Sequence, residues 1–249
     1  MSEAMVMGWR QYRLERRMFW RNPTAAFFNF LFPLILLALF GAVFSNDQAV
    51  LNVIVPGIAG MSVMSTTFTA LAHNMTYLRE EGVLKRMRGT PLPAGSYLAA
   101  IAANAVTNSV LQVGIIVVSG KLFFGIPWPR DFLELAVFVA AGVVCFASLG
   151  VALSHVIPNF ESAPAYVNAV FLPVIFISGV FYDVHHMPDF LRTIGEVLPL
   201  THLINGLRGA IVRGSDLRVN ASDLAVIAAW ALPAMVLAAR GFSWDQRRT

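Results

Sequence analysis

The sequence predicts an all-α membrane protein: a single transmembrane domain over residues 1–249 with six transmembrane helices. Hydrophobic residues make up 57% of the chain and charged residues only 13%, whereas soluble domains carry roughly 25% charged residues. The mean hydropathy is +0.66. Six apolar runs are long enough to cross the membrane, which takes about 20 residues for about 30 Å of hydrocarbon. No hydrophilic block is long enough to form a separate soluble domain.

The first element, residues 3–21, is predicted to be an amphipathic helix lying in the membrane interface. An ordinary cytosolic helix with a solvated basic face is the alternative. Asn22-Pro23 ends the helix, because a residue before proline avoids the α region. Arg16 falls among the aromatic residues and breaks an otherwise regular pattern. Aromatic residues on one side and arginines beside them suit the headgroup region: Met5, Trp9, Tyr12, Phe19 and Trp20, then Arg10, Arg13, Arg17 and Arg21.

The spans follow in order, and the last of them is the weakest. Asp223 and Arg240 bracket a short apolar run there, although Arg240 can extend its charge to the interface. The apolar run after the arginine-rich N-terminal segment is too long for the core of a signal peptide, so a retained first span is expected. The six spans are predicted at about 24–44, 52–77, 96–123, 132–156, 162–182 and 224–241.

The basic residues predict how the chain is oriented in the cell membrane. If the N-terminus is inside, twelve of the 18 lysines and arginines fall in inner segments and six in outer segments. Cytoplasmic segments of membrane proteins carry this excess of basic residues. We therefore expect a multi-pass protein with both termini in the cytoplasm, and residues 79–93 then also face the cytoplasm.

Residues 183–223 are predicted to form an outer segment with two short amphipathic helices. Pro188 is placed to start the first helix and Pro199 to stop it. Thr201 is a candidate N-cap for the second helix, which should end at Gly214. We expect both helices to dip into the interface or to cap the bundle, the alternative being a plain extracellular hairpin.

The densest cluster of charge lies between two long uncharged runs, at residues 79–93 (Arg-Glu-Glu-Gly-Val-Leu-Lys-Arg-Met-Arg-Gly-Thr-Pro-Leu-Pro). Gly82 and Pro91 should bound a short helix with apolar residues on one side and basic residues on the other. Acids before bases also match the helix dipole. A loop that only supplies positive charge would need neither feature, so the pattern predicts a docking helix for a soluble partner. The residues involved are Glu80, Glu81, Gly82, Leu84, Lys85, Arg86 and Arg88.

Two polar stripes lie inside predicted spans. Amide side chains that face lipid are costly, so both stripes should face the bundle or a cavity. Hydrogen bonding between helices explains them as well as a substrate path does. No span has an aspartate or glutamate at its centre, which argues against a carrier coupled to protons or sodium. The stripes are Ser62, Thr66, Thr69 and His73 in the second span, and Asn104, Asn108 and Gln112 in the third.

Enzymatic interpretations fit the sequence poorly. Intramembrane CAAX-type proteases carry Glu-Glu-x-x-x-Arg, but Glu80-Glu81 is followed by Lys85 at the arginine position, in a segment too polar for the membrane. Residues 114–122 (Gly-Ile-Ile-Val-Val-Ser-Gly-Lys-Leu) have one residue too many between the glycines of a phosphate-binding loop, and leucine after the lysine. We therefore expect no catalytic residue and no ATPase in this chain.

Metal and nucleic-acid sites are not expected either. The pair His185-His186 has no third ligand at a suitable spacing. The basic residues are not interleaved with aromatic residues on a soluble surface, which a nucleic-acid interface would require. No cofactor is predicted to bind this chain.

The order of parts and two local sequences resemble the type-2 permease of ATP-binding-cassette (ABC) exporters. One is the segment at 79–93. The other combines residues 173–181 (Pro-Val-Ile-Phe-Ile-Ser-Gly-Val-Phe) with 187–192 (Met-Pro-Asp-Phe-Leu-Arg) and 198–201 (Leu-Pro-Leu-Thr). The resemblance covers essentially the whole chain. Tyr182-Asp183 departs from the family, which often has a proline-bearing turn there.

The resemblance implies a permease that pairs with a second permease subunit, as a homodimer or heterodimer, above two cytosolic ATPase subunits that hold ATP and magnesium. Glu80–Arg88 corresponds to the family's coupling helix, residues 3–21 to its connecting helix, and residues 188–212 to an outer lid. The substrate path is implied at Ser62, Thr66, Thr69, Asn168, Phe171 and Phe176.

The substrate class follows only loosely from the residues. With 19 phenylalanines in the chain and mild polar stripes in the spans, a hydrophobic or amphipathic cargo is expected, such as a drug, an antibiotic or a lipid, as in antibiotic efflux. An exporter of polysaccharide or glycolipid is one alternative. A non-transport intramembrane enzyme or an assembly protein is the other.

Overall fold

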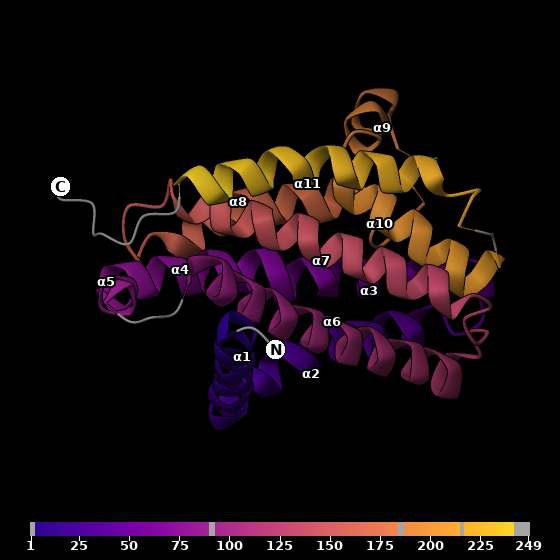
Figure 1. Ribbon diagram of the computed structural model, residues 1–249. Helices are drawn as coiled ribbons and strands as arrows, with labels where there is room; N and C mark the ends of the chain where they lie inside the picture. The colour runs from indigo at the N-terminus through magenta and orange to yellow at the C-terminus, as the bar shows by residue number, and fades with distance from the viewer. Residues whose placement is uncertain (1–2, 90–92, 184–186, 215–216, 242–249) are drawn as a thin grey trace.

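The computed structural model describes residues 3–89, 93–183, 187–214 and 217–241, and these residues fold into helices and turns without a strand. Long helices lie side by side in a bundle, and the N-terminal helix crosses them (Figure 1). The predicted all-α class is confirmed. The elements are α1 (Glu3–Arg21), α2 (Pro23–Val43), α3 (Gln48–Met64), η1 (Ser65–Thr69), α4 (Ala70–Glu80), α5 (Val83–Arg88), α6 (Ala94–Phe124), α7 (Phe132–Ser154), α8 (Ala163–Ile177), α9 (Asp189–Gly195), α10 (Pro199–Arg208), η3 (Gly209–Arg213) and α11 (Ala221–Gly241).

Four helices among the described residues are long and apolar enough to cross a membrane: Gln48–Glu80, Gly95–Phe124, Phe132–Ser154 and Ala221–Arg240. The first of them joins α3, the π-helical turn η1 and α4 into one continuous helix. The other two predicted spans correspond to α2 and α8, where the apolar stretches Asn29–Val43 and Ala163–Ile177 are shorter. That all six helices cross the membrane stays a prediction.

Aspartate side chains cap the N-termini of two long helices. Asp47 precedes α3, and its carboxylate accepts a hydrogen bond from the Val50 amide at 3.1 Å. Asp131 does the same for α7, accepting from the amides of Leu133 and Glu134 at 2.8 and 2.9 Å. These acids satisfy amides that the helix leaves unpaired at its N-terminus. Both caps lie in the turns predicted between spans.

The fifth predicted span is shorter than expected. It was placed at 162–182, but α8 ends at Ile177. Gly179 takes a φ of 72°, so the chain turns there. The turn brings the carbonyl of Val180 against Gly57 of α3, where a Cβ atom on the glycine would lie only 2.0 Å from the oxygen. The close approach explains why the helix stops: the chain folds back into the bundle.

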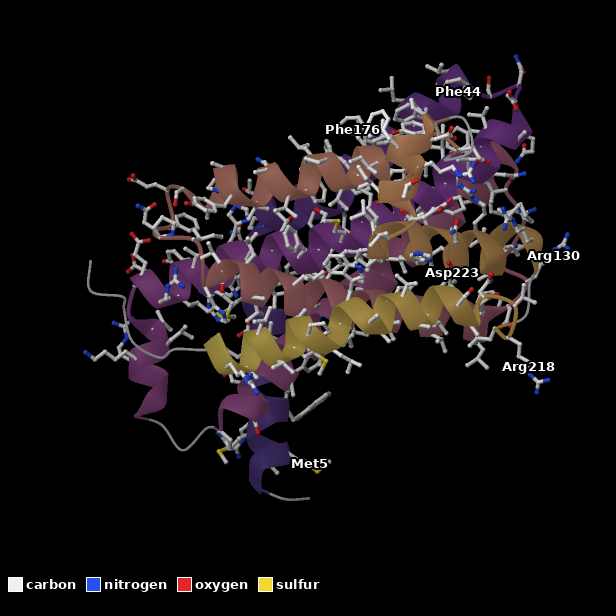
Figure 2. All side chains as sticks on the ribbon, turned by 90° about the horizontal axis from the view of Figure 1, so that it is seen from above. Met5, Phe44, Arg130, Phe176, Arg218 and Asp223 are labelled. Atoms are coloured by element: carbon white, nitrogen blue, oxygen red, sulfur yellow. The ribbon has the colours of Figure 1, made fainter. Side chains whose placement is uncertain are left out.

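Aromatic rings join α2 to the end of α8 beside this turn. Phe40 stacks on Phe181 with ring centroids 5.2 Å apart, and Phe181 in turn contacts Phe176 at 6.0 Å. Phe44 stacks on Phe40 one turn further along α2. Figure 2 shows Phe44 and Phe176 at this corner of the molecule. The rings fix where α2 ends relative to α8.

The second outer helix is placed inside the bundle rather than at its surface. Pro199, predicted to stop the first helix, instead opens α10, and Leu198 rather than Thr201 occupies the N-cap position. Proline fits the first helical turn because it lacks an amide that would be left unpaired. α10 ends at Arg208 and packs against α3, α7 and α11. η3 continues it to Arg213, so the helical stretch ends at Gly214, with a φ of 66°, as predicted. Its buried face consists of Leu200, Leu203, Ile204, Leu207 and Ile211.

Replacing Gly57 with alanine should destabilise the protein. The added Cβ atom meets backbone at 2.0 Å, so α3 or the turn after α8 must move, and such overpacking costs about 1–3 kcal/mol. Gly114→Ala in α6 is the matched control, because its Cβ atom meets nothing within 4 Å. Thermal unfolding of the purified variants in detergent checks this. Equal midpoints for the two variants would contradict the close approach.

Candidate coupling site

The charged segment after the second span lies at one end of the bundle, turned away from the long helix that precedes it (Figure 1). The long helix ends at Glu80, and Gly82 takes a φ of 63° before α5 begins at Val83. Gly82 therefore bounds the short helix, as predicted. Glu80 and Glu81, which the resemblance assigned to the coupling helix, close α4 and directly precede this turn.

Leu84, which is only 3% exposed, packs α5 against the bundle, and the basic residues Lys85 and Arg86 are exposed. This agrees with the predicted division into an apolar and a basic side. The side chain of Arg88, and Pro91, which was predicted to bound the helix, lie outside the described part of the chain.

Arg79 fastens this end of the long helix to the turn between α7 and α8. Its Nη1 donates to the Ser154 carbonyl at 2.7 Å, and its Nη2 donates to the Ile157 carbonyl at 2.6 Å. The carbonyls at the end of a helix lack partners within the helix, and a cation is favoured there by the helix dipole. Arg79 therefore completes α7 while it holds α4 in place.

Glu80 adds a second link to the same turn. Its Oε2 accepts a hydrogen bond from the Phe160 amide at 2.5 Å, and Tyr77 packs against the Phe160 ring with centroids 5.4 Å apart. The turn between α7 and α8 is thus a second element of the site, which sequence reasoning missed. The available signal was its position: it is a short polar connection on the same predicted side of the membrane as α5.

The polar stripes of the second and third spans are used for contacts between helices. The Thr66 hydroxyl donates to Gln112 Oε1 at 2.6 Å, and Gln112 Nε2 donates to the Asn29 carbonyl at 2.6 Å. This chain joins η1, α6 and α2. Asn108 accepts from Arg16 Nη1 at 2.5 Å, which explains why an arginine falls among the aromatic residues of α1. Helix-to-helix hydrogen bonding, one of the two expectations, therefore accounts for Thr66, Asn108 and Gln112, whereas Ser62 and His73 bond carbonyls of their own helix.

The residues suggested for a substrate path do not share one surface of this chain. Ser62 and Thr66 are buried inside the bundle, at 0% and 5% exposure, and Thr69 is half-buried. Asn168 and Phe176 are exposed on α8, and Phe171 is half-buried beside them. Their role in a path stays a prediction.

Comparison with known proteins decides the family. The profile of the ABC-2 type transporter family matches residues 3–212, a stretch that contains α1, α5 and the α7–α8 turn. The chain belongs to the ABC-2 type transporter family. Membership implies a membrane permease that works with an ABC ATPase, as the resemblance suggested.

Among the curated relatives of this ABC-2 permease, two are named as transport permeases and a third as a nodulation protein. The putative transport permease ycf38 of Porphyra purpurea is 28% identical over 207 residues, which are 78% of this chain and 71% of that protein. The inner membrane transport permease YadH of Escherichia coli K12 is 23% identical over 187 residues, 71% of this chain and 72% of its own length. Nodulation protein J of Rhizobium meliloti is 27% identical over 161 residues, 64% of this chain and 60% of that protein.

The permease carries a second polar cluster at the other end of the bundle, where Asp223 is labelled in Figure 2. His202 of α10 contacts Asp223 Oδ1 through Nδ1 at 2.5 Å and the Glu196 carbonyl through Nε2 at 2.8 Å. It thereby joins α10 to the start of α11 and the end of α9. The hydrogen bond to Asp223 raises the pKa of His202, with burial acting in the opposite direction. A protonated imidazole can donate to both acceptors at once, and a neutral one to only one.

Replacing Arg79 with glutamine should loosen the α7–α8 turn. Hydrogen bonds to a charged group contribute about 1.5–3 kcal/mol each, so amide hydrogen exchange in residues 155–162 should rise by about tenfold or more, since 1.4 kcal/mol corresponds to tenfold. Glu81→Gln is the control, because Glu81 is exposed and adjacent to the site. Unchanged exchange in Arg79→Gln would show that the link does not hold the turn.

The cluster around His202 should make stability depend on pH. Because the folded-state pKa is raised above 6.5, the stabilisation is fully present below pH 6.5 and is lost as the pH rises through the raised pKa. It amounts to about 1.5–3 kcal/mol, as for a hydrogen bond to a charged group. Thermal unfolding of wild type and His202→Gln across this pH range isolates the effect.

Asp223→Asn is the second variant, because it removes the main cause of the shift. The difference in unfolding midpoint between wild type and either variant should be largest at low pH and shrink as the pH rises. A difference that is constant with pH, or that grows as the pH rises, would contradict the assignment.

Proposed function

We propose that this chain is the permease subunit of an exporter that moves a hydrophobic or amphipathic substrate, with a separate ABC ATPase docking on α5. The observation that carries the proposal is the position of α5 and the exposure of its basic residues. α5 presents Lys85 and Arg86 to the outside at the end of the long helix, while Arg79 and Glu80 bind that helix end to the α7–α8 turn.

Such a construction suits the transmission of force. The helix Gln48–Glu80 has 33 residues, about 50 Å at 1.5 Å per residue, so a displacement of α5 would reach the middle of the bundle through α4, as far as the π-helical turn η1. The links of Arg79 and Glu80 carry the same displacement into α7 and α8. ATP and magnesium would be held by the partner ATPase, since this chain offers no phosphate-binding loop.

The exposed side of α8 is where we place the second permease subunit and the path between the two. Tyr166, Leu172 and Phe176 are exposed there, at 40%, 46% and 53%, and Asn168 lies among them. A surface of aromatic and aliphatic groups with one amide suits an amphipathic cargo better than a polar glycan. The same arrangement would place α5 and the end of α11 in the cytoplasm.

Charge reversal on α5 tests the proposal. The double variant Lys85→Glu/Arg86→Glu should lower both the stimulation of the co-expressed ATPase and the rate of efflux by at least about tenfold. The reason is that like charges across a docking surface cost several kcal/mol. Arg218→Glu in the outer segment is the matched control, since Arg218 is also exposed and lies at the other end of the molecule (Figure 2). Stimulation and efflux should stay at the wild-type level in the control.

Two outcomes would contradict the proposal. One is unchanged ATPase stimulation and efflux in the double reversal when pull-down shows the complex intact. The other is labelling of Arg86→Cys by an impermeant thiol reagent added outside intact cells, because no cytosolic ATPase could then reach α5. The natural cysteine, Cys145, is buried and gives little background.

A further inference from the structure

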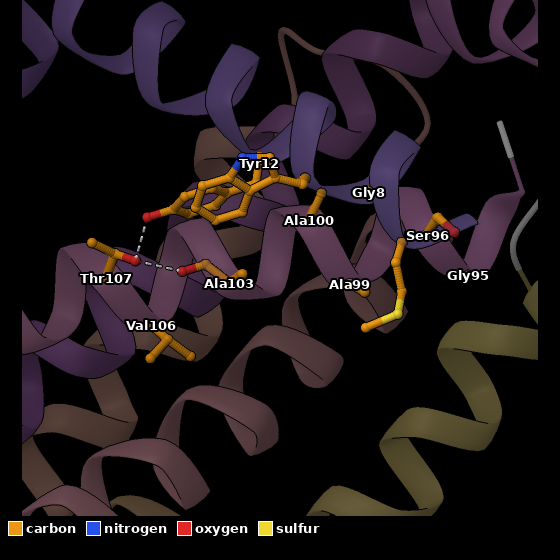
Figure 3. Close-up of a pocket in the computed structure, with 11 residues that line it drawn as sticks. Gly8, Tyr12, Gly95, Ser96, Ala99, Ala100, Ala103, Val106 and Thr107 are labelled. Carbon is orange, nitrogen blue, oxygen red and sulfur yellow. Dashed lines mark hydrogen bonds between the residues drawn. The ribbon is translucent and has the colours of Figure 1, made fainter. Parts of the chain in front are cut away.

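A groove of about 840 Å³ runs between the N-terminal helix and α6. Figure 3 shows it from the side on which Tyr12 of α1 lies over α6, with Thr107 at one end and Gly95 and Ser96 at the other. Met5, Trp9 and Tyr12 form one wall, and Ala99, Ala103 and Thr107 line α6 opposite. Almost all of this lining is apolar, so the groove suits a hydrocarbon group.

Polar contacts hold the groove open. The Tyr12 hydroxyl donates to Thr107 Oγ1 at 3.0 Å, because the Thr107 hydroxyl itself donates to the Ala103 carbonyl. One turn further along α1, Arg16 donates to Asn108. These two contacts fix α1 on α6, while the small side chains of Ala99 and Ala103 leave space beside it. Trp9 stacks on Tyr12 with centroids 5.2 Å apart and stiffens the wall.

The groove continues into an exposed apolar stripe on α6. Val110, Leu111, Ile115 and Val118 are 53%, 41%, 38% and 42% exposed. From Thr107 to Val118 the helix rises by about 16 Å, so the stripe extends the apolar surface of the groove by about half of the 30 Å of hydrocarbon.

The rim of the groove is basic. Arg13 follows Trp9 by one helical turn and Arg16 follows Tyr12 by one turn, so both lie next to the aromatic wall. Arg13 is exposed, and so are Arg10 and Arg17 on the neighbouring side of α1. The nearby acid, Glu15, accepts a hydrogen bond from Gln11 at 2.8 Å. An apolar slot with a cationic edge is complementary to an anionic amphiphile.

We propose that this groove binds an anionic glycerophospholipid, with one acyl chain between α1 and α6 and the phosphate beside Arg13. The assignment of that lipid to the inner leaflet rests on the cytoplasmic placement of α1 in the proposed function. The lipid is a resident of the protein, distinct from the exported substrate. It fills space that α1 and α6 do not close by themselves, and so it holds α1 at the end of the molecule where α5 lies.

Fluorescence quenching in lipid nanodiscs tests the proposal on the full-length permease. Brominated phosphatidylglycerol and brominated phosphatidylcholine are compared as quenchers, and the signal of Trp9 is taken as the difference between wild type and Trp9→Phe. Phosphatidylglycerol should quench Trp9 at a severalfold lower mole fraction than phosphatidylcholine. Arg13→Gln should reduce this preference about fivefold, the equivalent of about 1 kcal/mol per basic residue near a membrane surface, and leave quenching by phosphatidylcholine unchanged.

A groove-filling variant provides the second arm. Ala103→Phe should remove most of the quenching of Trp9 by phosphatidylglycerol. Ala140→Phe is its matched control, because Ala140 is an exposed alanine of α7 outside the groove, and it should keep the wild-type preference. Circular dichroism of both variants establishes that the helices are intact.

Three results would overturn the proposal: equal quenching by the two lipids in wild type, unchanged quenching in Ala103→Phe, or displacement of phosphatidylglycerol by an exported drug. The last result would assign the groove to the transported substrate. None of these measurements involves the ATPase or the direction of α1 relative to the cell. Failure of lipid binding therefore stays distinguishable from failure of coupling at α5.

Discussion

A polar side chain inside an apolar bundle must find a partner on another helix, and this constraint fixes how the helices of this chain lie against each other. Lipid tails are as apolar as leucine, so burial of apolar surface hardly distinguishes one helix contact from another in a membrane. The chain from Thr66 through Gln112 to the Asn29 carbonyl and the bond from Arg16 to Asn108 do distinguish them. Each joins residues far apart in the sequence, and together they place α1, α2 and η1 around α6.

The same constraint operates at the coupling end with charged groups. A helix end leaves carbonyls without partners, and the guanidinium of Arg79 donates to the last carbonyl of α7, that of Ser154, and to the Ile157 carbonyl in the following turn. The guanidinium needs acceptors and the two carbonyls need donors, so these two hydrogen bonds satisfy the arginine and the carbonyls together. Glu80 then meets the next free amide, that of Phe160. As a result, two adjacent residues of the long helix, Arg79 and Glu80, join its end to the α7–α8 turn.

The lengths of the hydrophobic runs predicted the bounds of the long helices well. They did not predict the features that depend on contacts between residues far apart in the sequence. The spans expected at 96–123 and 132–156 became Ala94–Phe124 and Phe132–Ser154, because apolar runs bounded by Pro93, Gly125 and Asp131 leave little choice. The end of α8 was missed because it depends on Gly57, more than a hundred residues away. The prediction for Pro199 was wrong because a proline can either follow the end of a helix or open one, and here it opens α10. The short helix at α5 was predicted, but the hydrogen bond between Glu80 at the end of α4 and Phe160 carries no local signal.

α6 extends from the candidate coupling site to the groove beside α1, and it is bonded to the long helix at the π-helical turn η1. α6 begins at Ala94, shortly after α5 ends at Arg88, and its first turns line the groove. Higher up, Gln112 of α6 is bonded to Thr66 within η1, where the regular hydrogen bonding of the long helix is interrupted. Such a turn is a natural hinge. If α4 tilts about η1, the Thr66–Gln112 bond can stay in place while the lower halves of both helices move together, so that α1 follows through Arg16 and Tyr12.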